Sequence, residues 1–362
     1  MMRVASNGPA ENTDSEIRGA EANYIHIGLV NNMPDSALEA TERQFSTLLD
    51  AAAEKTVVRV SLYALPGVPR SHEGNLRINR CYSDINCLWN TRLDGLIVTG
   101  AEPLAPALED EPYWGSLATL LDWAEHNTYS SIWSCLAAHA AVLEIDGIKR
   151  RPLNDKRFGL FECAKVSDNA VTAKVTSGVP ERLRVPHSRW NDIPGDALKA
   201  CGYHVLTRSE DGGIDAFVKQ RKSLFVFFQG HPEYDADSLL LEYRRDVRRF
   251  LRRERGSYPS LPQGCFDADD ADRLTALRER ALADRREELL ADFPAALLAT
   301  KVRNTWRPAA VSIYRNWLQY ISDCKVRRAS RPEYERRSSV ALWPVLKADA
   351  LQARETGGDS PL

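Results

Sequence analysis

A cysteine at position 135 stands between two contrasting segments of the chain. An apolar stretch, SSIWS at 130–134, runs directly into Cys135, and a run of small residues, LAAHA at 136–140, follows it. The pattern predicts a strand that turns sharply into a helix, as in a nucleophile elbow. Such a turn exposes the sulfur, and the helix N-terminus favours a thiolate and an oxyanion. Because a lone cysteine is more often a buried structural residue, other residues must support this interpretation.

A histidine and a carboxylate provide that support about 100 residues later. The apolar stretch at 224–228 leads into the loop GHPEYD at 230–235, in which His231 and Glu233 are two residues apart. An imidazole on such a loop can reach a thiol on a neighbouring strand while the carboxylate fixes its tautomer. Cys135, His231 and Glu233 together predict a Cys-His-Glu triad for acyl transfer.

Two further segments supply candidate residues for substrate binding. We predict that PHSR at 186–189 forms a short polar loop, in which Ser188 and Arg189 could recognise a carboxylate. His187, in the same loop, is either part of the site or a solvated histidine. His139, one helical turn beyond the cysteine, either lines the site or packs in the core.

The loop TGAEP at 99–103 follows another apolar stretch. Gly100 and Ala101 could bring backbone amides close to the substrate and support an oxyanion. The loop has neither the repeated glycines of a dinucleotide fingerprint nor the GK[ST] of a P-loop, so we expect no bound nucleotide cofactor.

Arginines recur at helical spacing after the catalytic loop. Most of them are expected on a solvated helix face, but Arg245, about three turns into the helix predicted at 235–255, could reach back into the cleft. The run consists of Arg244, Arg245, Arg248, Arg249, Arg252 and Arg253.

Short apolar runs alternate with segments of helical period, which predicts a flavodoxin-like α/β fold whose mainly parallel sheet has helices on both faces. The catalytic loops would then follow the carboxyl ends of the strands, where open α/β sheets bind ligands. Strands are predicted at 24–30, 57–64, 94–99, 130–134 and 224–228, with antiparallel additions at 159–166 and 216–219. Helices are predicted at 37–53, 113–126, 136–143, 235–255, 272–293 and 308–324.

This pattern divides the chain into four parts. We predict a mobile leader over 1–22, a catalytic α/β domain over 23–256, a helical extension that packs on it over 257–326, and a flexible tail over 327–362.

The composition is that of an ordinary globular protein of 362 residues, with 43% hydrophobic residues. Its net charge of only −2 gives no overall attraction to nucleic acid or membranes, so small-molecule partners are expected. The seven cysteines include no CxxC pair and no zinc-like spacing, which favours a reducing cytoplasm and predicts no metal site. The polar N-terminus lacks the apolar core of a signal peptide, and no apolar run approaches the roughly 20 residues that span a bilayer.

The sequence resembles those of the homoserine O-succinyltransferase family. Members of this family are acyltransferases of methionine biosynthesis with a class I glutamine-amidotransferase-like fold. The resemblance covers roughly 24–320 and implies that Cys135 takes an acyl group from succinyl- or acetyl-coenzyme A, with no bound cofactor. It also implies that His231 and Glu233 complete the triad, that Arg245 binds the amino-acid acceptor, and that a homodimer is possible. The matching motifs are NNMPDSALEATERQF (31–45), DGLIVTGAEP (94–103), EPYW (111–114), LDWAEHNTYSSIWSCLAAHAA (121–141), VPHSR (185–189), GHPEYD (230–235), LEYRRD (241–246) and TWRPAAVSIYRNWLQY (305–320).

Some positions depart from the family pattern. Asp35 and Ser36 stand where the family usually has paired lysines, and His139 stands where it has glutamine. Succinyl-using members have a small residue in the TGAP loop where acetyl-using members tend to have glutamate. Here an alignment on the proline places Ala105 at that position, which favours succinyl, and leaves Glu102 as an irregularity. Acetyl as the acyl group and serine as the acceptor remain open.

Two other classes of protein compete with an acyltransferase. A glutamine amidotransferase would share the fold and the triad, but such domains usually have glycines beside the cysteine, where this chain has Ser134 and Leu136. A non-catalytic binding domain would not need a complete Cys, His and Glu set.

Overall fold

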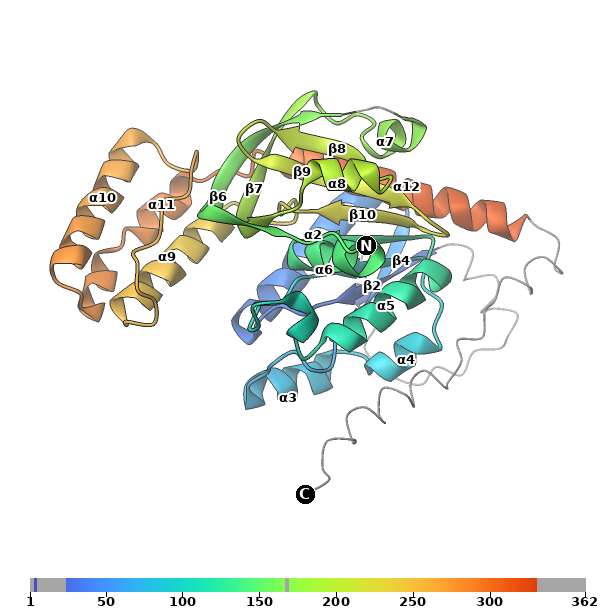
Figure 1. Cartoon of the computed structure of the whole chain (residues 1–362), viewed down its shortest axis with the longest axis horizontal. Coiled ribbons are helices and arrows are strands. Elements are labelled where there is room, and N and C mark those ends of the chain that lie inside the picture. The colour runs from blue at the N-terminus through green and yellow to red at the C-terminus, as the bar shows by residue number, and fades with distance from the viewer. Residues whose placement is uncertain (1–2, 5–23, 167–168, 331–362) are drawn as a thin grey trace, which may run out of the picture.

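The computed structural model describes residues 3–4, 24–166 and 169–330. Its centre is a ten-stranded sheet in the order β1-β3-β2-β4-β5-β10-β9-β8-β6-β7 (Figure 1). Most of the predicted leader and the predicted tail beyond 330 lie outside the described residues. The strands are β1 Arg3–Val4, β2 Tyr24–Val30, β3 Val57–Tyr63, β4 Gly95–Val98, β5 Ser130–Ser134, β6 Arg151–Lys165, β7 Arg182–Asp192, β8 His204–Ser209, β9 Gly213–Gln220 and β10 Leu224–Phe228.

The parallel half of the sheet confirms the predicted flavodoxin-like class. Strands β3, β2, β4, β5 and β10 are parallel neighbours, and counted along the chain from β2 their spatial order is 2-1-3-4-5. Phe228 at the end of β10 pairs with Ser134 at the end of β5, and Val98 at the end of β4 pairs with Trp133. The loops after these three strands therefore emerge together at one edge of the sheet.

Strands β9, β8, β6 and β7 extend the sheet in antiparallel fashion. The prediction of a polar loop at 186–189 is wrong, because these residues lie inside β7, where Ser188 pairs with Phe158 of β6. Because of Pro186 and the polar residues around it, the sequence pattern did not indicate a strand here. An edge strand tolerates proline, and β7 is the last strand of the sheet.

Both faces of the sheet are covered by helices, as predicted. One face packs apolar side chains against α2, α7 and α12, and the other packs against α4, α5, α6 and α8. Neighbouring residues of β4 alternate between these cores: Ile97 belongs to the first, and Leu96 and Val98 belong to the second. The helices up to α8 are η1 Asp35–Ala37, α2 Leu38–Ala53, α3 His72–Cys81, α4 Ile85–Trp89, η2 Leu108–Asp110, α5 Trp114–Asn127, α6 Leu136–Asp146, α7 Ala170–Val175 and α8 Gly195–Ala200.

A helical lobe beside β6 and β7 has its own apolar core (Figure 1). It contains α9 Ser238–Leu251, α10 Ala268–Ala283, η3 Glu287–Asp292 and α11 Ala295–Lys301. The single helix predicted at 272–293 is thus broken, because Asp284 has an extended backbone after α10 and Arg285 turns aside to donate to the carbonyl oxygen of Phe250.

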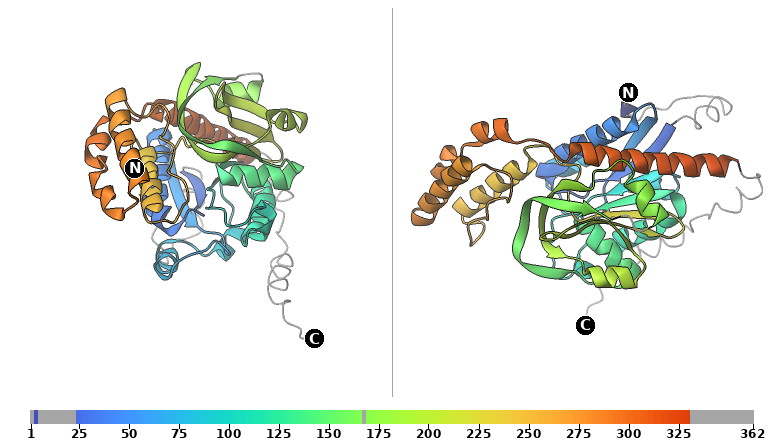
Figure 2. Two further views of the ribbon diagram at one scale, coloured as in Figure 1. Left: turned by 60° about the vertical axis from the view of Figure 1, so that its left-hand side comes forward. Right: turned by 90° about the horizontal axis from the view of Figure 1, so that it is seen from above.

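The last described helix, α12 Arg307–Ala329, leaves the lobe and returns along the sheet (Figure 2). Trp317 in α12 donates a hydrogen bond from Nε1 to Oγ of Ser130 at 2.8 Å, and Lys325 pairs with Asp94 at 2.7 Å. No helix among the described residues is both long and apolar enough to cross a membrane. The division into a catalytic domain and a helical extension stays a prediction.

Candidate active site

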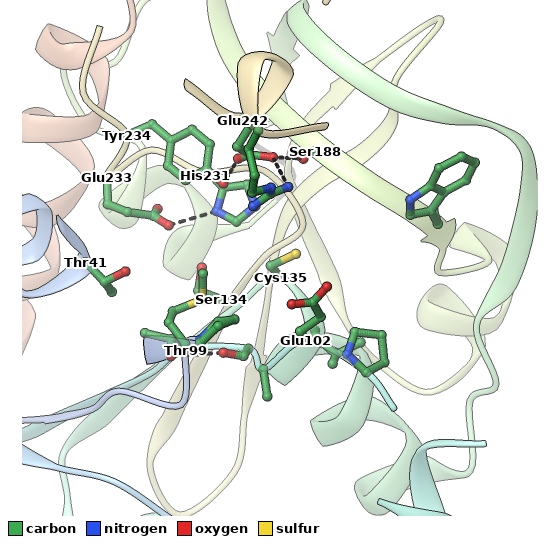
Figure 3. Close-up of a pocket in the computed structure, with 18 of the residues that line it drawn as sticks. Thr41, Thr99, Glu102, Ser134, Cys135, Ser188, His231, Glu233, Tyr234 and Glu242 are labelled. Carbon is green, nitrogen blue, oxygen red and sulfur yellow. Dashed lines mark hydrogen bonds and ion pairs between the residues drawn. The ribbon is translucent and has the colours of Figure 1, made fainter. Parts of the chain in front are cut away.

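A pocket of about 410 Å³ lies at the edge of the sheet where the parallel strands end. Residues of the loops after β2, β4, β5 and β10 line it, together with side chains from β6, β7 and α9. Cys135, His231 and Glu233 all face this pocket (Figure 3). The structure therefore brings together the three residues that the sequence nominated from segments about 100 residues apart.

Cys135 lies at the turn between β5 and α6, which confirms the predicted change from strand to helix. Its backbone has φ 53° and ψ −115°, a conformation that side-chain-bearing residues rarely adopt. The backbone N–H of Cys135 donates to the carbonyl oxygen of Phe228 at 2.7 Å, so the turn is tied to the end of β10. Such a turn presents the sulfur to the pocket beside the N-terminus of α6.

His231 is fixed on both sides within the loop after β10. Its Nδ1 is 2.8 Å from Oε1 of Glu233, and both side chains are less than 10% exposed. The backbone N–H of His231 donates to the carbonyl oxygen of Pro186 in β7 at 2.8 Å. The ring of Tyr234 stacks on the imidazole, with centroids 4.2 Å apart and an interplanar angle of 17°. These contacts hold Nδ1 toward the carboxylate and leave Nε2 for the cysteine.

The charges around His231 favour its protonated form. Burial alone would lower the pKa of this imidazole, but its interactions with Cys135 and Glu233 together outweigh burial and raise the pKa well above its usual value. These interactions favour an imidazolium between the sulfur and the carboxylate. A positive charge at this position stabilises a thiolate, the reactive form of cysteine.

The loop after β4 lies directly against the beginning of α6. A Cβ atom on Gly100 would come within 3.0 Å of the backbone nitrogen of Leu136, so only glycine permits this approach. Gly100, Ala101 and Leu136 all line the pocket beside the sulfur. The first N–H groups of a helix have no partner within the helix, so the start of α6 can donate to an oxyanion formed at Cys135.

The two residues predicted to recognise a carboxylate in β7 have different surroundings. Ser188 lines the pocket and donates from Oγ to Oε2 of Glu242 at 2.6 Å. The side chain of Arg189 is only 2% exposed, and its guanidinium donates to Asp192 Oδ1 and to the carbonyl oxygen of Gly212. The structure thus brings Ser188 to the site, whereas Arg189 lies outside the lining of the pocket.

Arg245 lines the pocket from α9, the helix that follows the loop after β10. Its Nη2 is 3.0 Å from Oδ1 of Asp246. Oδ2 of Asp246 also lies 3.3 Å from Nζ of Lys156 in β6 and 3.5 Å from Nη1 of Arg255. Sequence reasoning missed Lys156, Glu242 and Asp246. The available signal was the position of Glu242, three residues before Arg245 and four before Asp246, because residues three or four apart share a helix face.

The other two candidate histidines are buried and lie outside the lining of the pocket. His187 is in β7 with Nε2 3.4 Å from Asp215, and burial together with Arg189 holds the pKa of His187 well below its usual value. Burial and nearby arginines lower the pKa of His139 to about 3. Both imidazoles are therefore neutral at pH 7, and the position of His187 differs from the solvated loop considered for it.

Comparisons with known proteins agree with the expected resemblance. A family model described as homoserine O-succinyltransferase matches residues 10–326. A homoserine O-succinyltransferase of Rhodopseudomonas palustris is 51% identical over 301 residues, which are 83% of this chain and 89% of that protein. A second homoserine O-succinyltransferase, from Methylorubrum extorquens (strain DSM 6343 / CIP 106787 / DM4), is 46% identical over 299 residues, which are 83% of this chain and 88% of that protein.

Among solved structures, that of a glutamine amidotransferase from Thermotoga maritima aligns with 82% of this chain. The alignment covers 98% of the amidotransferase chain, at 14% sequence identity and a TM-score of 0.43. The family model runs from before β2 into α12, and the two relatives each cover 83% of the chain. On that extent of similarity, the chain belongs to the homoserine O-succinyltransferase family.

Proposed function

We propose that this protein transfers a succinyl group from succinyl-coenzyme A to the hydroxyl of L-homoserine, through a thioester on Cys135. The observation that carries the proposal is the position of Cys135, at a strained turn beside the buried pair of His231 and Glu233. Membership of the family supports the choice of substrates. Succinyl-coenzyme A is a substrate in this scheme and free coenzyme A is a product, and no resident cofactor takes part.

In the first half-reaction the thiolate of Cys135 attacks the carbonyl carbon of the donor thioester. A new carbon–sulfur bond forms, and the carbonyl oxygen becomes an oxyanion that faces the N-terminus of α6 and the loop at Gly100 and Ala101. When the oxyanion collapses, the bond to coenzyme A breaks. The leaving sulfur takes the proton from His231, which becomes neutral.

In the second half-reaction the neutral imidazole accepts the proton of the homoserine hydroxyl. The hydroxyl oxygen attacks the thioester on Cys135, and the sulfur leaves as a thiolate beside the restored imidazolium. Glu233 stays ionised and keeps His231 in the tautomer that presents Nε2, the role of the carboxylate in related triads. The cycle therefore needs no proton acceptor other than the histidine.

The acceptor must be held so that its hydroxyl reaches Nε2 of His231. We propose that Arg245 binds the acceptor carboxylate, because a guanidinium matches a carboxylate in two parallel hydrogen bonds. Ser188, at the same wall of the pocket, contributes a hydroxyl. The buried guanidinium of Arg189 is already occupied by Asp192 and Gly212, so we propose a supporting role for it in β7.

A role in methionine biosynthesis, a cytoplasmic location and a homodimer remain predictions. The test of the reaction itself is an assay with the full chain that crosses succinyl- and acetyl-coenzyme A with homoserine and serine. We expect the highest kcat/KM for succinyl-coenzyme A with homoserine. A preference for acetyl-coenzyme A or serine would correct the proposed substrates but leave the proposed thioester mechanism in place. Hydrolysis of glutamine without acyl transfer would reassign the protein as an amidohydrolase.

A further inference from the structure

Besides His231, one lysine and three arginines line the pocket, and three of these four side chains converge on one carboxylate. Lys156, Arg245 and Arg255 each lie within 3.5 Å of Asp246, whose side chain is only 7% exposed. Glu242 is the second acid of this group, at 3.6 Å from Lys156. Three cations thus face two carboxylates, which leaves one net positive charge for a substrate anion.

The fourth basic residue, Arg249, is held differently. Its Nη1 lies 3.1 Å from Oε1 of Glu102, which belongs to the loop after β4 on another wall of the pocket. In the part of the chain that the structure describes, Glu102 is the sole ion-pair partner of Arg249. The two side chains are 37% and 50% exposed, so solvent screens this pair and another anion can replace Glu102.

The proposed mechanism places two carboxylates in this pocket at the same time. The succinyl group remains on Cys135 while homoserine binds, and each of them carries a carboxylate. Two anions that share a small pocket repel each other, and a cation beside each anion offsets this repulsion. The group around Asp246, which includes Arg245, supplies one cationic position, and a second is required.

We infer that Arg249 is the specificity-determining residue that binds the terminal carboxylate of the acyl donor, and that Glu102 is its partner while the pocket is empty. This inference rests on the proposed function. Arg249 is one helical turn beyond Arg245 on α9, so the two guanidinium groups can serve two carboxylates side by side. Figure 3 shows Glu102 and Cys135 on the same side of the pocket, and Glu102 is the residue that pairs with Arg249.

The test measures acylation of Cys135 without an acceptor, which isolates the donor half-reaction. Succinyl-coenzyme A is compared with butyryl-coenzyme A, whose acyl chain also has four carbons but ends in a methyl group. For Arg249→Gln we expect the second-order rate constant to fall about ten- to a hundred-fold with the succinyl donor and less than about three-fold with the butyryl donor. Arg248→Gln is the matched control, because Arg248 is an exposed residue of the same helix outside the pocket lining.

Glu102→Gln separates recognition from a purely structural role of the ion pair. If Glu102 competes with the substrate for Arg249, this change should increase the rate constant with the succinyl donor and leave the butyryl donor unchanged. Equal losses with both donors in either variant would show that the pair only holds the loop, and unchanged rates in Arg249→Gln would exclude Arg249 from donor binding. Absence of any adduct in the unaltered enzyme, with either donor, would instead contradict the proposed function.

Discussion

The indole Nε1 of Trp306 donates a hydrogen bond to the backbone carbonyl oxygen of Tyr234 at 3.0 Å. Nδ2 of Asn304 donates to the same oxygen at 3.0 Å. Tyr234 in turn stacks on the imidazole of His231, so the segment before α12 restrains the loop after β10 from a position about 70 residues farther along the chain. Residues remote from the triad in sequence thus help to fix its geometry.

We predict that Trp306→Phe lowers kcat/KM about ten-fold, because the loop after β10 loses one of the two donors that hold Tyr234. Loss of a buried hydrogen bond should also lower the free energy of unfolding by about 1 to 3 kcal/mol. Trp317→Phe is the matched control, since it removes a similar bond from the indole to Ser130, at the opposite end of β5 from Cys135. Urea unfolding and steady-state kinetics on both variants test this. Equal loss of activity in the two variants would contradict a local effect on the loop.

His231→Ala should lower kcat/KM by about 10² to 10⁴-fold, because both half-reactions need its proton transfer. Glu233→Gln should be less damaging but still severe, since the amide retains a partner for Nδ1 and loses the negative charge. The comparison variant is His187→Gln, whose buried side chain lies outside the pocket lining. Rates are measured per folded molecule by active-site titration. A larger effect of His187→Gln than of His231→Ala on the chemical step would refute the choice of the base.

Arg245→Lys should raise the acceptor KM about ten-fold or more and leave formation of the Cys135 thioester almost unchanged. A lysine keeps the charge but loses the planar fork that matches a carboxylate. Burst kinetics measure acylation, and steady-state kinetics measure transfer to homoserine. Arg244→Lys, at an exposed neighbouring position, is the control. Equal damage to both half-reactions would give Arg245 a structural role.

Asp215 should make the stability of the protein depend on pH. Its side chain is only 4% exposed and accepts a hydrogen bond from Oγ1 of Thr207 at 2.7 Å, and burial raises its pKa to about 6 from an ordinary 3.8. The folded protein therefore holds a proton that the unfolded chain releases between about pH 4 and 6. The stabilisation is present below about pH 4 and is lost as the pH rises through 6.

The variant Asp215→Asn removes this titration and keeps an oxygen for Thr207. Its free energy of unfolding, relative to that of the unaltered protein, should rise by about 2 kcal/mol between pH 4 and pH 7. Urea unfolding at the two pH values measures the difference. A constant difference between the two proteins would mean that Asp215 has an ordinary pKa in the fold.

The sequence predicted the strands of the parallel half best. The bounds of β2, β5 and β10 were predicted to the residue, because each is a short, mostly apolar run between polar segments. Strand β7 was missed, because Pro186 and polar neighbours obscure its alternation and its pairing with β6 depends on distant residues. Helix α10 was extended too far, since the contact of Arg285 with Phe250 that accompanies the break is tertiary.

The site was predictable where its residues follow strand ends. Cys135, His231 and Glu233 could be brought together because parallel strands end at a common edge. Arg189 could not be placed correctly, since its burial results from its position in β7. The pairing of Arg249 with Glu102 joins residues far apart in sequence, so no local pattern indicates it.

The most direct test of the central claim is the intact mass of the full chain after incubation with succinyl-coenzyme A and no acceptor. We expect the addition of one succinyl group to Cys135, its absence in Cys135→Ala, and its loss when homoserine is added. Peptide mapping locates the adduct. Turnover under the same conditions without any adduct, or transfer that survives in Cys135→Ala, would contradict a thioester mechanism.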